Sequence, residues 1–273
     1  MLGTCLDRVR AAAPLIHCIT NYVTVNDVAN ALLACGASPI MADDPGEAAD
    51  ISKLCAGLTI NIGTLNQRTL PAMELAGQTA AALDHPTVLD PVGAGASALR
   101  TQSAKRLLEQ ISFTAIRGNI SEFHALFHGA ADTQGVDASR TDAVTEENLE
   151  TGISFAKEAA ARFGCLVSIT GAIDLVSDGQ RCFVIRNGRR EMSRITGTGC
   201  QLSALTAAFL AANPNRTLEA AAAAVACMGV AGEIGWSHLA PWEGNATYRN
   251  RILDAIYHMD ERQLEEGANY EIR

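Results

Sequence analysis

The sequence predicts an α/β protein with a mainly parallel central sheet and helices on both faces. Short apolar segments alternate with helix-forming segments from residue 15 to residue 170, which is the pattern of repeated strand–helix units. The apolar segments show little alternation between apolar and polar residues, as expected of strands covered on both sides. No linker or change in composition divides the chain, so we expect one domain over residues 1–273.

The strand–helix units can be followed in order along the first part of the chain. Residues 15–19 are apolar and predict a first strand. The following helix has apolar residues at helical spacing from Val25 to Leu33, and Gly36 can close it. Further strands are expected at 38–41, 58–62, 87–90, 114–117 and 166–170, and further helices at about 45–55, 66–83, 98–110, 121–128 and 147–162.

The pattern changes after residue 170. Two short apolar segments, 174–177 and 181–185, flank Asp178-Gly179-Gln180 and predict a β-hairpin. A glycine-rich loop and a helix follow, then an alanine-rich helix at about 218–236 and a last helix at about 246–259. A polar loop is expected at 132–142.

Composition excludes several classes of protein. The net charge of −9, with only three lysines, argues against a nucleic-acid-binding surface. Neither an N-terminal export signal nor a membrane-spanning apolar run stands out. The eight cysteines are scattered without a Cys-x-x-Cys pair, so we expect reduced thiols in a cytoplasmic protein.

The central stretch of the sequence is the glycine-rich segment 195–200, which leads into an unbroken helix-forming run. Such a turn presents free backbone N–H groups and the positive end of a helix dipole, which suit a phosphate or an oxyanion. Cys200 stands where the helix begins, so we expect its thiol pKa to be lowered. The competing interpretation is an ordinary loop before a buried helix, with an inert cysteine.

Polar residues follow the predicted strands, and ligands of open parallel sheets bind at the carboxyl ends of strands. Asp90 ends one strand with a carboxylate that can hold Mg²⁺ directly or through water. The next strand ends with Arg117 and Asn119, followed by the carboxylate of Glu122. Together with the glycine-rich segment, these residues indicate phosphate chemistry more strongly than they indicate helix capping.

Other chemistries fit the sequence less well. A P-loop is excluded because Gly-x-x-x-x-Gly-Lys-[Ser/Thr] is absent. Residues 93–98 satisfy Gly-x-Gly-x-x-Ala, but the next strand end carries Arg117 where a dinucleotide-binding fold needs an acidic residue. Cys200 as a covalent nucleophile needs a histidine base, and the spacing of the histidines identifies none.

Four motifs, in this order, resemble the hydroxyethylthiazole kinase family. They are Pro14-Leu15-Ile16-His17-Cys18-Ile19-Thr20-Asn21-Tyr22-Val23-Thr24, Asp90-Pro91-Val92-Gly93-Ala94, Arg117-Gly118-Asn119-Ile120-Ser121-Glu122 and Thr196-Gly197-Thr198-Gly199-Cys200. The resemblance runs from about residue 14 to about residue 260. It implies a ribokinase-like three-layer α/β/α fold and a role in thiamine salvage. The implied reaction transfers the γ-phosphoryl group of ATP, with Mg²⁺, to the primary alcohol of 4-methyl-5-(2-hydroxyethyl)thiazole.

The resemblance also implies roles for single residues and an assembly. The substrate-binding positions are Met41, Gly197 and Asn21, the nucleotide-binding positions are Arg117 and Thr170, and the metal-side carboxylates are Asp90 and Glu122. The implied assembly is a homotrimer with sites between subunits, in which the segment containing Asn21 is expected to reach the neighbour's thiazole pocket. Cys200 matches the catalytic position, where most ribokinase-like enzymes carry an aspartate base.

Two other enzymes share this fold and remain alternatives. One is a kinase for a different small alcohol, such as a hydroxymethylpyrimidine, and the other is an ATP-dependent dehydratase that repairs hydrated nicotinamide cofactors. Both favour aspartate at position 200, so Cys200 counts against them. A nucleotide sensor without enzymatic activity is a further alternative.

Overall fold

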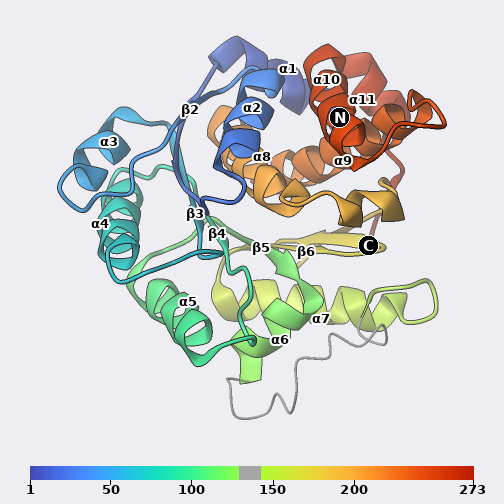
Figure 1. Ribbon diagram of the computed structural model, residues 1–273. Coiled ribbons are helices and arrows are strands. Elements are labelled where there is room, and N and C mark those ends of the chain that lie inside the picture. Colours follow the sequence, from blue (N-terminus) through green and yellow to red (C-terminus); the bar gives the residue numbers. More distant parts are fainter. Residues whose placement is uncertain (129–142) are drawn as a thin grey trace.

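The computed structural model describes residues 1–128 and 143–273, and its described part is built around one nine-stranded sheet (Figure 1). The strands are β1 (Leu15–Ile19), β2 (Ser38–Ile40), β3 (Gly57–Asn61), β4 (Thr87–Asp90), β5 (Ala115–Asn119), β6 (Leu166–Thr170), β7 (Asp174–Ser177), β8 (Cys182–Ile185) and β9 (Tyr270–Ile272). Their order across the sheet is β2-β1-β3-β4-β5-β6-β7-β8-β9. Strands β2 to β6 pair in parallel, and β6 to β9 pair antiparallel.

Helices cover both faces of the sheet (Figure 1). They are α1 (Gly3–Ala12), α2 (Val25–Cys35), α3 (Ala48–Leu54), α4 (Thr69–Ala82), α5 (Ala98–Gln110), α6 (Ile120–His128), α7 (Leu149–Phe163), α8 (Thr198–Ala212), α9 (Thr217–Ser237), α10 (Asn245–His258) and α11 (Glu261–Gly267), with a 3₁₀ turn η1 (Arg190–Arg194). One apolar core joins α1, α2 and α8 to α11 with the sheet, and a second joins α3 to α7 with its other face. The three-layer α/β/α architecture is therefore confirmed.

Helices α8 and α9 lie at the centre of the first core, and their buried residues are mainly aliphatic. In α8 every residue from Gln201 to Leu210 is buried, because this helix lies between the sheet and the helices α1, α2 and α9. Helix α9 is long and apolar enough, by length and composition, to cross a membrane. However, 83% of its most apolar window is buried within the fold, which is typical of a core helix. Small alanine side chains let these helices pack closely.

Most expected elements occur within three residues of their predicted bounds, and the hairpin is formed by β7 and β8. The helix predicted at about 246–259 is α10, but the prediction that it is the last helix is wrong, because α11 and β9 follow it. Helix α1 and the turn η1 are additional elements. The polar loop expected at 132–142 lies outside the described residues.

Candidate active site

The predicted site residues gather at the carboxyl ends of the parallel strands. Asn21 follows β1, Met41 follows β2, Asp90 ends β4, Arg117 lies in β5 and Thr170 ends β6. The N-terminus of α8 reaches the same edge, because α8 packs against β3 and β4. Parallel strands place their carboxyl ends together, so residues far apart in the sequence meet here.

Two glycines allow the loop before α8 to approach its neighbours. Gly197 has a φ of 90°, in the left-handed region, and a β-carbon there would lie 2.5 Å from the Thr24 methyl group. A β-carbon on Gly199 would collide with the guanidinium of Arg117. Since Gly197 offers no side chain to cap α8, the first backbone N–H groups of the helix face the site. The loop can therefore bind an anion, as its sequence predicts.

Cys200 lies in the first turn of α8, where its sulfur meets two amide donors. Asn21 Nδ2 and Asn61 Nδ2 each lie 3.2 Å from Cys200 Sγ. Asn21 Oδ1 in turn accepts hydrogen bonds from the backbone N–H and the hydroxyl of Thr24. Both asparagine side chains are thereby fixed, and both point N–H groups toward the sulfur.

The prediction of a lowered Cys200 pKa is wrong. Burial and the nearby negative charge of Asp90 raise the pKa of the thiol above its ordinary value. Hydrogen bonds from Thr24, Asn21 and Asn61 act in the opposite direction without overcoming the burial. The helix N-terminus therefore does not by itself make this thiol acidic, and the protonated form prevails at neutral pH.

Asp90 is completely buried beneath the loop. Its Oδ2 accepts hydrogen bonds of 2.8 Å from Asn61 Nδ2 and of 2.8 Å from the Ser203 hydroxyl. Its Oδ1 accepts no hydrogen bond within the described chain, and Arg117 Nη1 lies 3.8 Å from it. Burial raises the pKa of this carboxyl, while the charge of Arg117 opposes the shift.

Glu122 is held in the first turn of α6 by a reciprocal cap. The Glu122 carboxylate accepts hydrogen bonds from the backbone N–H groups of Asn119 at 2.8 Å and of Gly93 at 2.9 Å. Asn119 Oδ1 accepts the backbone N–H of Glu122 at 2.9 Å. Burial, and then the charge of Asp90, raise the pKa of Glu122, which indicates that the two carboxyl groups act on each other.

The two carboxyl groups fit a magnesium ion that also binds phosphate. Mg²⁺ in kinases usually takes one or two protein carboxylates and completes its shell with water and phosphate oxygens. Asp90 Oδ1 is buried without a hydrogen-bond partner in the described chain, as a metal-binding oxygen would be. Among the described residues, no group of three or more His, Cys, Asp and Glu side chains could hold a metal alone. The donor set therefore suits Mg²⁺ with a nucleotide.

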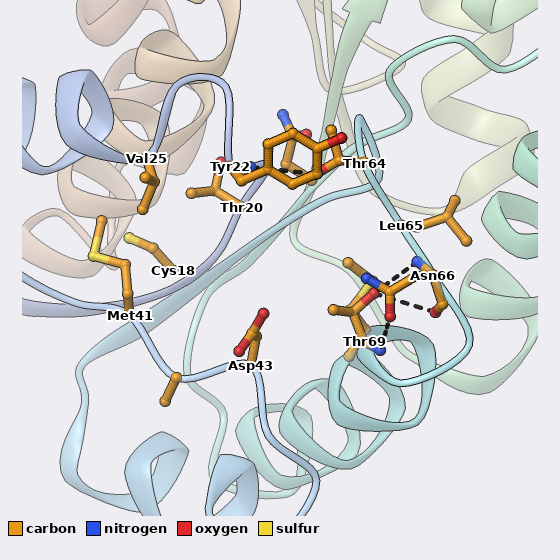
Figure 2. Close-up of a pocket in the computed structure, with 13 residues that line it drawn as sticks. Cys18, Thr20, Tyr22, Val25, Met41, Asp43, Thr64, Leu65, Asn66 and Thr69 are labelled. Atoms are coloured by element: carbon orange, nitrogen blue, oxygen red, sulfur yellow. Dashed lines mark hydrogen bonds between the residues drawn. The ribbon is translucent and has the colours of Figure 1, made fainter.

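Met41 lines a cavity of about 230 Å³ on one side of this cluster. Figure 2 shows Met41, Cys18 and Val25 on one side of the cavity and Asn66 and Thr69 on the other. Asn61 also lines this cavity, and its amide connects the cavity to Cys200. The mixed apolar and polar lining fits a small heteroaromatic molecule with a polar group.

Arg117 and Thr170 line a larger cavity of about 500 Å³ on the other side. The Arg117 guanidinium donates a hydrogen bond to the Thr170 hydroxyl, and Gly199 lies against it. The cavity continues between η1 and α9, with Arg189 and Arg190 at its border. Its size and its arginines suit a nucleotide.

The structure brings all eight predicted site residues to this edge, but with two qualifications. Gly197 packs against Thr24 and does not line the smaller cavity. Asn21 contacts Cys200 of its own chain, and the expectation that its segment reaches the thiazole pocket of a neighbouring subunit stays a prediction. The path of the chain after β1 turns Asn21 inward and leaves Tyr22 and Val23 exposed.

Several residues of the site lie outside the four sequence motifs and were not predicted. Asn61 and Ser203 form the buried cluster with Asp90, yet each stands in an ordinary strand or helix sequence. The wall of the larger cavity combines η1 with Met228 and Gly229 from the middle of α9. A strand-end position was the available signal for Asn61, because residue 61 closes β3.

A three-layer α/β fold with two cavities on either side of a glycine-rich helix N-terminus is the architecture of ribokinase-like kinases of small molecules. Staphylococcus aureus pyridoxal kinase, solved with AMP-PCP and pyridoxal, shares this fold with a TM-score of 0.62 and 15% identity, over 95% of this chain and 97% of that one. The model of the hydroxyethylthiazole kinase family matches residues 6–262. This chain belongs to that family and is a kinase that transfers phosphate to an alcohol.

Two further relatives agree over the full length. Hydroxyethylthiazole kinase of Clostridium acetobutylicum is 52% identical over 271 residues, which cover 99% of each chain. The solved structure of hydroxyethylthiazole kinase from Pyrococcus horikoshii matches with a TM-score of 0.88 and 35% identity, over 100% of this chain and 98% of that chain.

Proposed function

We propose that this single-domain kinase transfers the γ-phosphoryl group of ATP to the primary alcohol of 4-methyl-5-(2-hydroxyethyl)thiazole in thiamine salvage. The observation that carries the proposal is the cluster of the half-buried Cys200 with the buried Asn61 and Asp90, between two cavities. Such an arrangement brings an alcohol and a phosphate donor to opposite sides of one anion-binding loop. The family of the chain supports the identity of the alcohol.

The larger cavity is the proposed ATP site. Arg117 would bind phosphate oxygens beside the N-terminus of α8, and Thr170 keeps its guanidinium in place. Backbone N–H groups at the start of α8 stabilise charge on the transferred phosphoryl group. The nucleotide base would then lie between η1 and α9, where Met192 and Met228 provide apolar surface.

The smaller cavity is the proposed thiazole site. Its sulfur-containing and aliphatic side chains, with Met41 among them, match the weakly polar ring of the substrate. The hydroxyethyl arm would extend past Asn61 toward Cys200. This placement brings the alcohol oxygen near the glycine-rich loop.

Asp90 and Glu122 are the proposed Mg²⁺-side residues. Bound with ATP, Mg²⁺ neutralises charge on the phosphates during transfer. Asp90 provides the oxygen without a hydrogen-bond partner in the described chain, and Glu122 is fixed by two backbone N–H groups. Arg117 adds a second positive charge at the same place.

Cys200 is the proposed acceptor of the hydroxyl proton. In the transfer, the O–H bond breaks and the proton passes to the sulfur in its thiolate form. The new O–P bond forms as the P–O bond to ADP breaks. Phosphoryl transfer depends mainly on positioning and charge stabilisation, so a scarce thiolate held by two N–H donors is sufficient.

The proposed assembly is a cytoplasmic homotrimer with sites near the subunit interfaces. Tyr22 lines the smaller cavity and is 77% exposed, and the next residue, Val23, is 57% exposed. Adjacent exposed apolar side chains at the mouth of a site favour coverage by a second copy of the chain. The burial of 83% of the most apolar window of α9 is consistent with a core helix, which supports a cytoplasmic protein.

A coupled ADP-release assay with a panel of alcohols tests the proposed function. The thiazole alcohol should give ATP-dependent ADP release well above that of hydroxymethylpyrimidine, pyridoxal and a no-alcohol control. Faster turnover of the pyrimidine would favour the alternative kinase. ADP release only with a hydrated nicotinamide cofactor would favour the dehydratase, and binding of ATP without turnover would favour a sensor.

A further inference from the structure

Asn61 lies between Cys200 and Asp90 and contacts both. It is the last residue of β3 and is 2% exposed. Its Nδ2 lies 2.8 Å from Asp90 Oδ2 and 3.2 Å from Cys200 Sγ. The same side chain lines the smaller cavity. One amide thus contacts the proposed proton acceptor, the proposed metal-side carboxylate and the substrate cavity.

The orientation of this amide follows from its neighbours. The backbone N–H of Gly63 can only donate, and it lies 2.9 Å from Asn61 Oδ1, which also accepts Asn21 Nδ2 at 3.1 Å. The nitrogen of Asn61 therefore faces Asp90. Both hydrogens and both acceptor sites of Asn61 are used, so the amide cannot rotate without losing several buried hydrogen bonds.

We propose that Asn61 is a positioning residue for phosphoryl transfer. It fixes the distance between the Cys200 sulfur and the Asp90 carboxylate, and it keeps an N–H group directed at the sulfur. This inference rests on the proposed function, since it assumes that Cys200 and Asp90 act on the same reaction. A side chain that only filled space at the end of β3 would not need to donate one N–H group to Asp90 and the other to Cys200.

Asn61→Leu retains most of the volume and removes both donors. We expect kcat to fall by roughly 10²-fold, the scale for small misplacements in an active site, while KM for ATP changes little. Asn61→Asp is nearly isosteric and replaces the donor with an acceptor beside Asp90, so it should lose kcat to a similar extent. The second variant keeps the proposal testable if the leucine variant fails to fold.

A double-mutant cycle with Cys200→Ala separates positioning from a general structural effect. If Asn61 acts through Cys200, Asn61→Leu should cost much less in kcat when Cys200 is already alanine. Thr59→Val is the matched control, because Thr59 lies on the same strand and face, is buried, and its hydroxyl has no partner in the described chain. This control should keep wild-type kcat and melting temperature.

The possible outcomes are distinct. A wild-type enzyme that fails to phosphorylate the thiazole alcohol refutes the proposed function before Asn61 is considered. With an active wild type, full kcat in Asn61→Leu or Asn61→Asp would overturn this inference. Equal fold losses in the wild-type and Cys200→Ala backgrounds, or a loss confined to KM, would overturn it as well.

Discussion

In the proposed reaction Cys200 accepts the proton of the alcohol, and two amide N–H donors contact its sulfur. Asn21 and Asn61 favour the thiolate through their N–H groups. Burial and the charge of Asp90 oppose it and raise the thiol pKa. Burial and Asp90 would also raise the pKa of an aspartate at this position, but from an ordinary value far below that of a thiol, so a carboxylate ionises there at a lower pH than the sulfur does.

Replacing Cys200 with Asp and with Ala should give opposite results. Cys200→Asp should retain substantial turnover, because a carboxylate can accept the same proton. Cys200→Ala should lose ~10²-fold or more in kcat, the usual contribution of general base catalysis, while ATP still binds. Steady-state phosphorylation of the thiazole alcohol measures both, with thermal melts as the control for folding.

The pH profile adds a second readout for Cys200. Only the deprotonated sulfur accepts a proton, and its pKa is raised, so wild-type kcat should increase with pH into the alkaline range. Cys200→Asp should reach its plateau at a lower pH. If Cys200→Ala is as active as wild type, the cysteine is inert. The same conclusion follows if the protein folds with Ala at position 200 but unfolds with Asp.

Glu122 tests the proposed Mg²⁺ role. Glu122→Gln keeps the size and leaves an oxygen for the N–H groups of Gly93 or Asn119, but removes the charge. We expect turnover to fall tenfold or more and the Mg²⁺ concentration needed for half-maximal activity to rise. The melting temperature should change little, because the loss of one of the two backbone hydrogen bonds is offset by the removal of the desolvation cost of a buried carboxylate. Unchanged turnover across a Mg²⁺ titration would contradict the assignment.

At the scale of elements, the N-terminus of α8 depends on two glycines for different reasons. Gly197 has the left-handed φ and packs against Thr24, whereas Gly199 has an ordinary helical position but faces Arg117. Gly197→Ala should therefore destabilise the fold by ~1–3 kcal/mol, the usual cost of such backbone strain. Chemical denaturation measures this loss directly.

Gly199→Ala should behave differently. Its new methyl group displaces only the flexible end of Arg117, while alanine favours the helix by ~1 kcal/mol over glycine. The melting temperature should therefore stay at the wild-type value. KM for ATP should rise several-fold, because Arg117 is moved from its place beside Thr170. Equal effects of the two substitutions on stability would contradict this division of roles.

The repeated strand–helix units could be predicted from the sequence because each strand is a short apolar segment bounded by polar residues. Two of the missed helices also carry local signals. Helix α1 and its N-cap residue Leu2 bury Leu2, Cys5, Leu6 and Val9 at helical spacing, and α11 begins with a capping box formed by Asp260 and Gln263. Strand β9 has no such signal, because it depends on pairing with β8 some 90 residues earlier in the chain.

The candidate site could be predicted where its residues lie at or close to the end of a strand, or in a glycine-rich turn. Asp90 ends β4, Arg117 lies in β5, and Glu122 follows in the first turn of α6. The raised pKa of Cys200 could not be predicted from the sequence, because it depends on burial and on the charge of Asp90, which is 110 residues away in the sequence. The wall made by η1 and the middle of α9 is likewise a product of tertiary packing.

At the scale of the whole molecule, exposed apolar residues beside the thiazole cavity lead to a prediction about assembly. Val23→Asp places a charge in the proposed interface without touching the buried cluster. Light scattering should show a trimer for wild type and a smaller species for the variant, with activity reduced at low protein concentration. The matched control is Leu33→Asp, because Leu33 is also an exposed apolar residue but lies near the C-terminal end of α2, whereas Val23 directly follows the lining residue Tyr22.

A mixing experiment checks which residues share one site. Asn21 and Cys200 contact each other within one chain, so mixing an Asn21 variant with a Cys200 variant should restore no activity. Recovery of activity in mixed trimers would mean that Asn21 serves a neighbouring subunit. A fully active monomer would contradict the proposed trimer.

The central claim is that this chain moves a phosphoryl group from ATP to the thiazole alcohol at the Cys200 loop. Phosphorus NMR of a reaction containing the enzyme, Mg²⁺, ATP and the thiazole alcohol observes that transfer directly. The account predicts a phosphate monoester signal that grows in step with ADP and nearly disappears with Cys200→Ala. Inorganic phosphate in place of the monoester, or a monoester formed equally fast by the alanine variant, would contradict it.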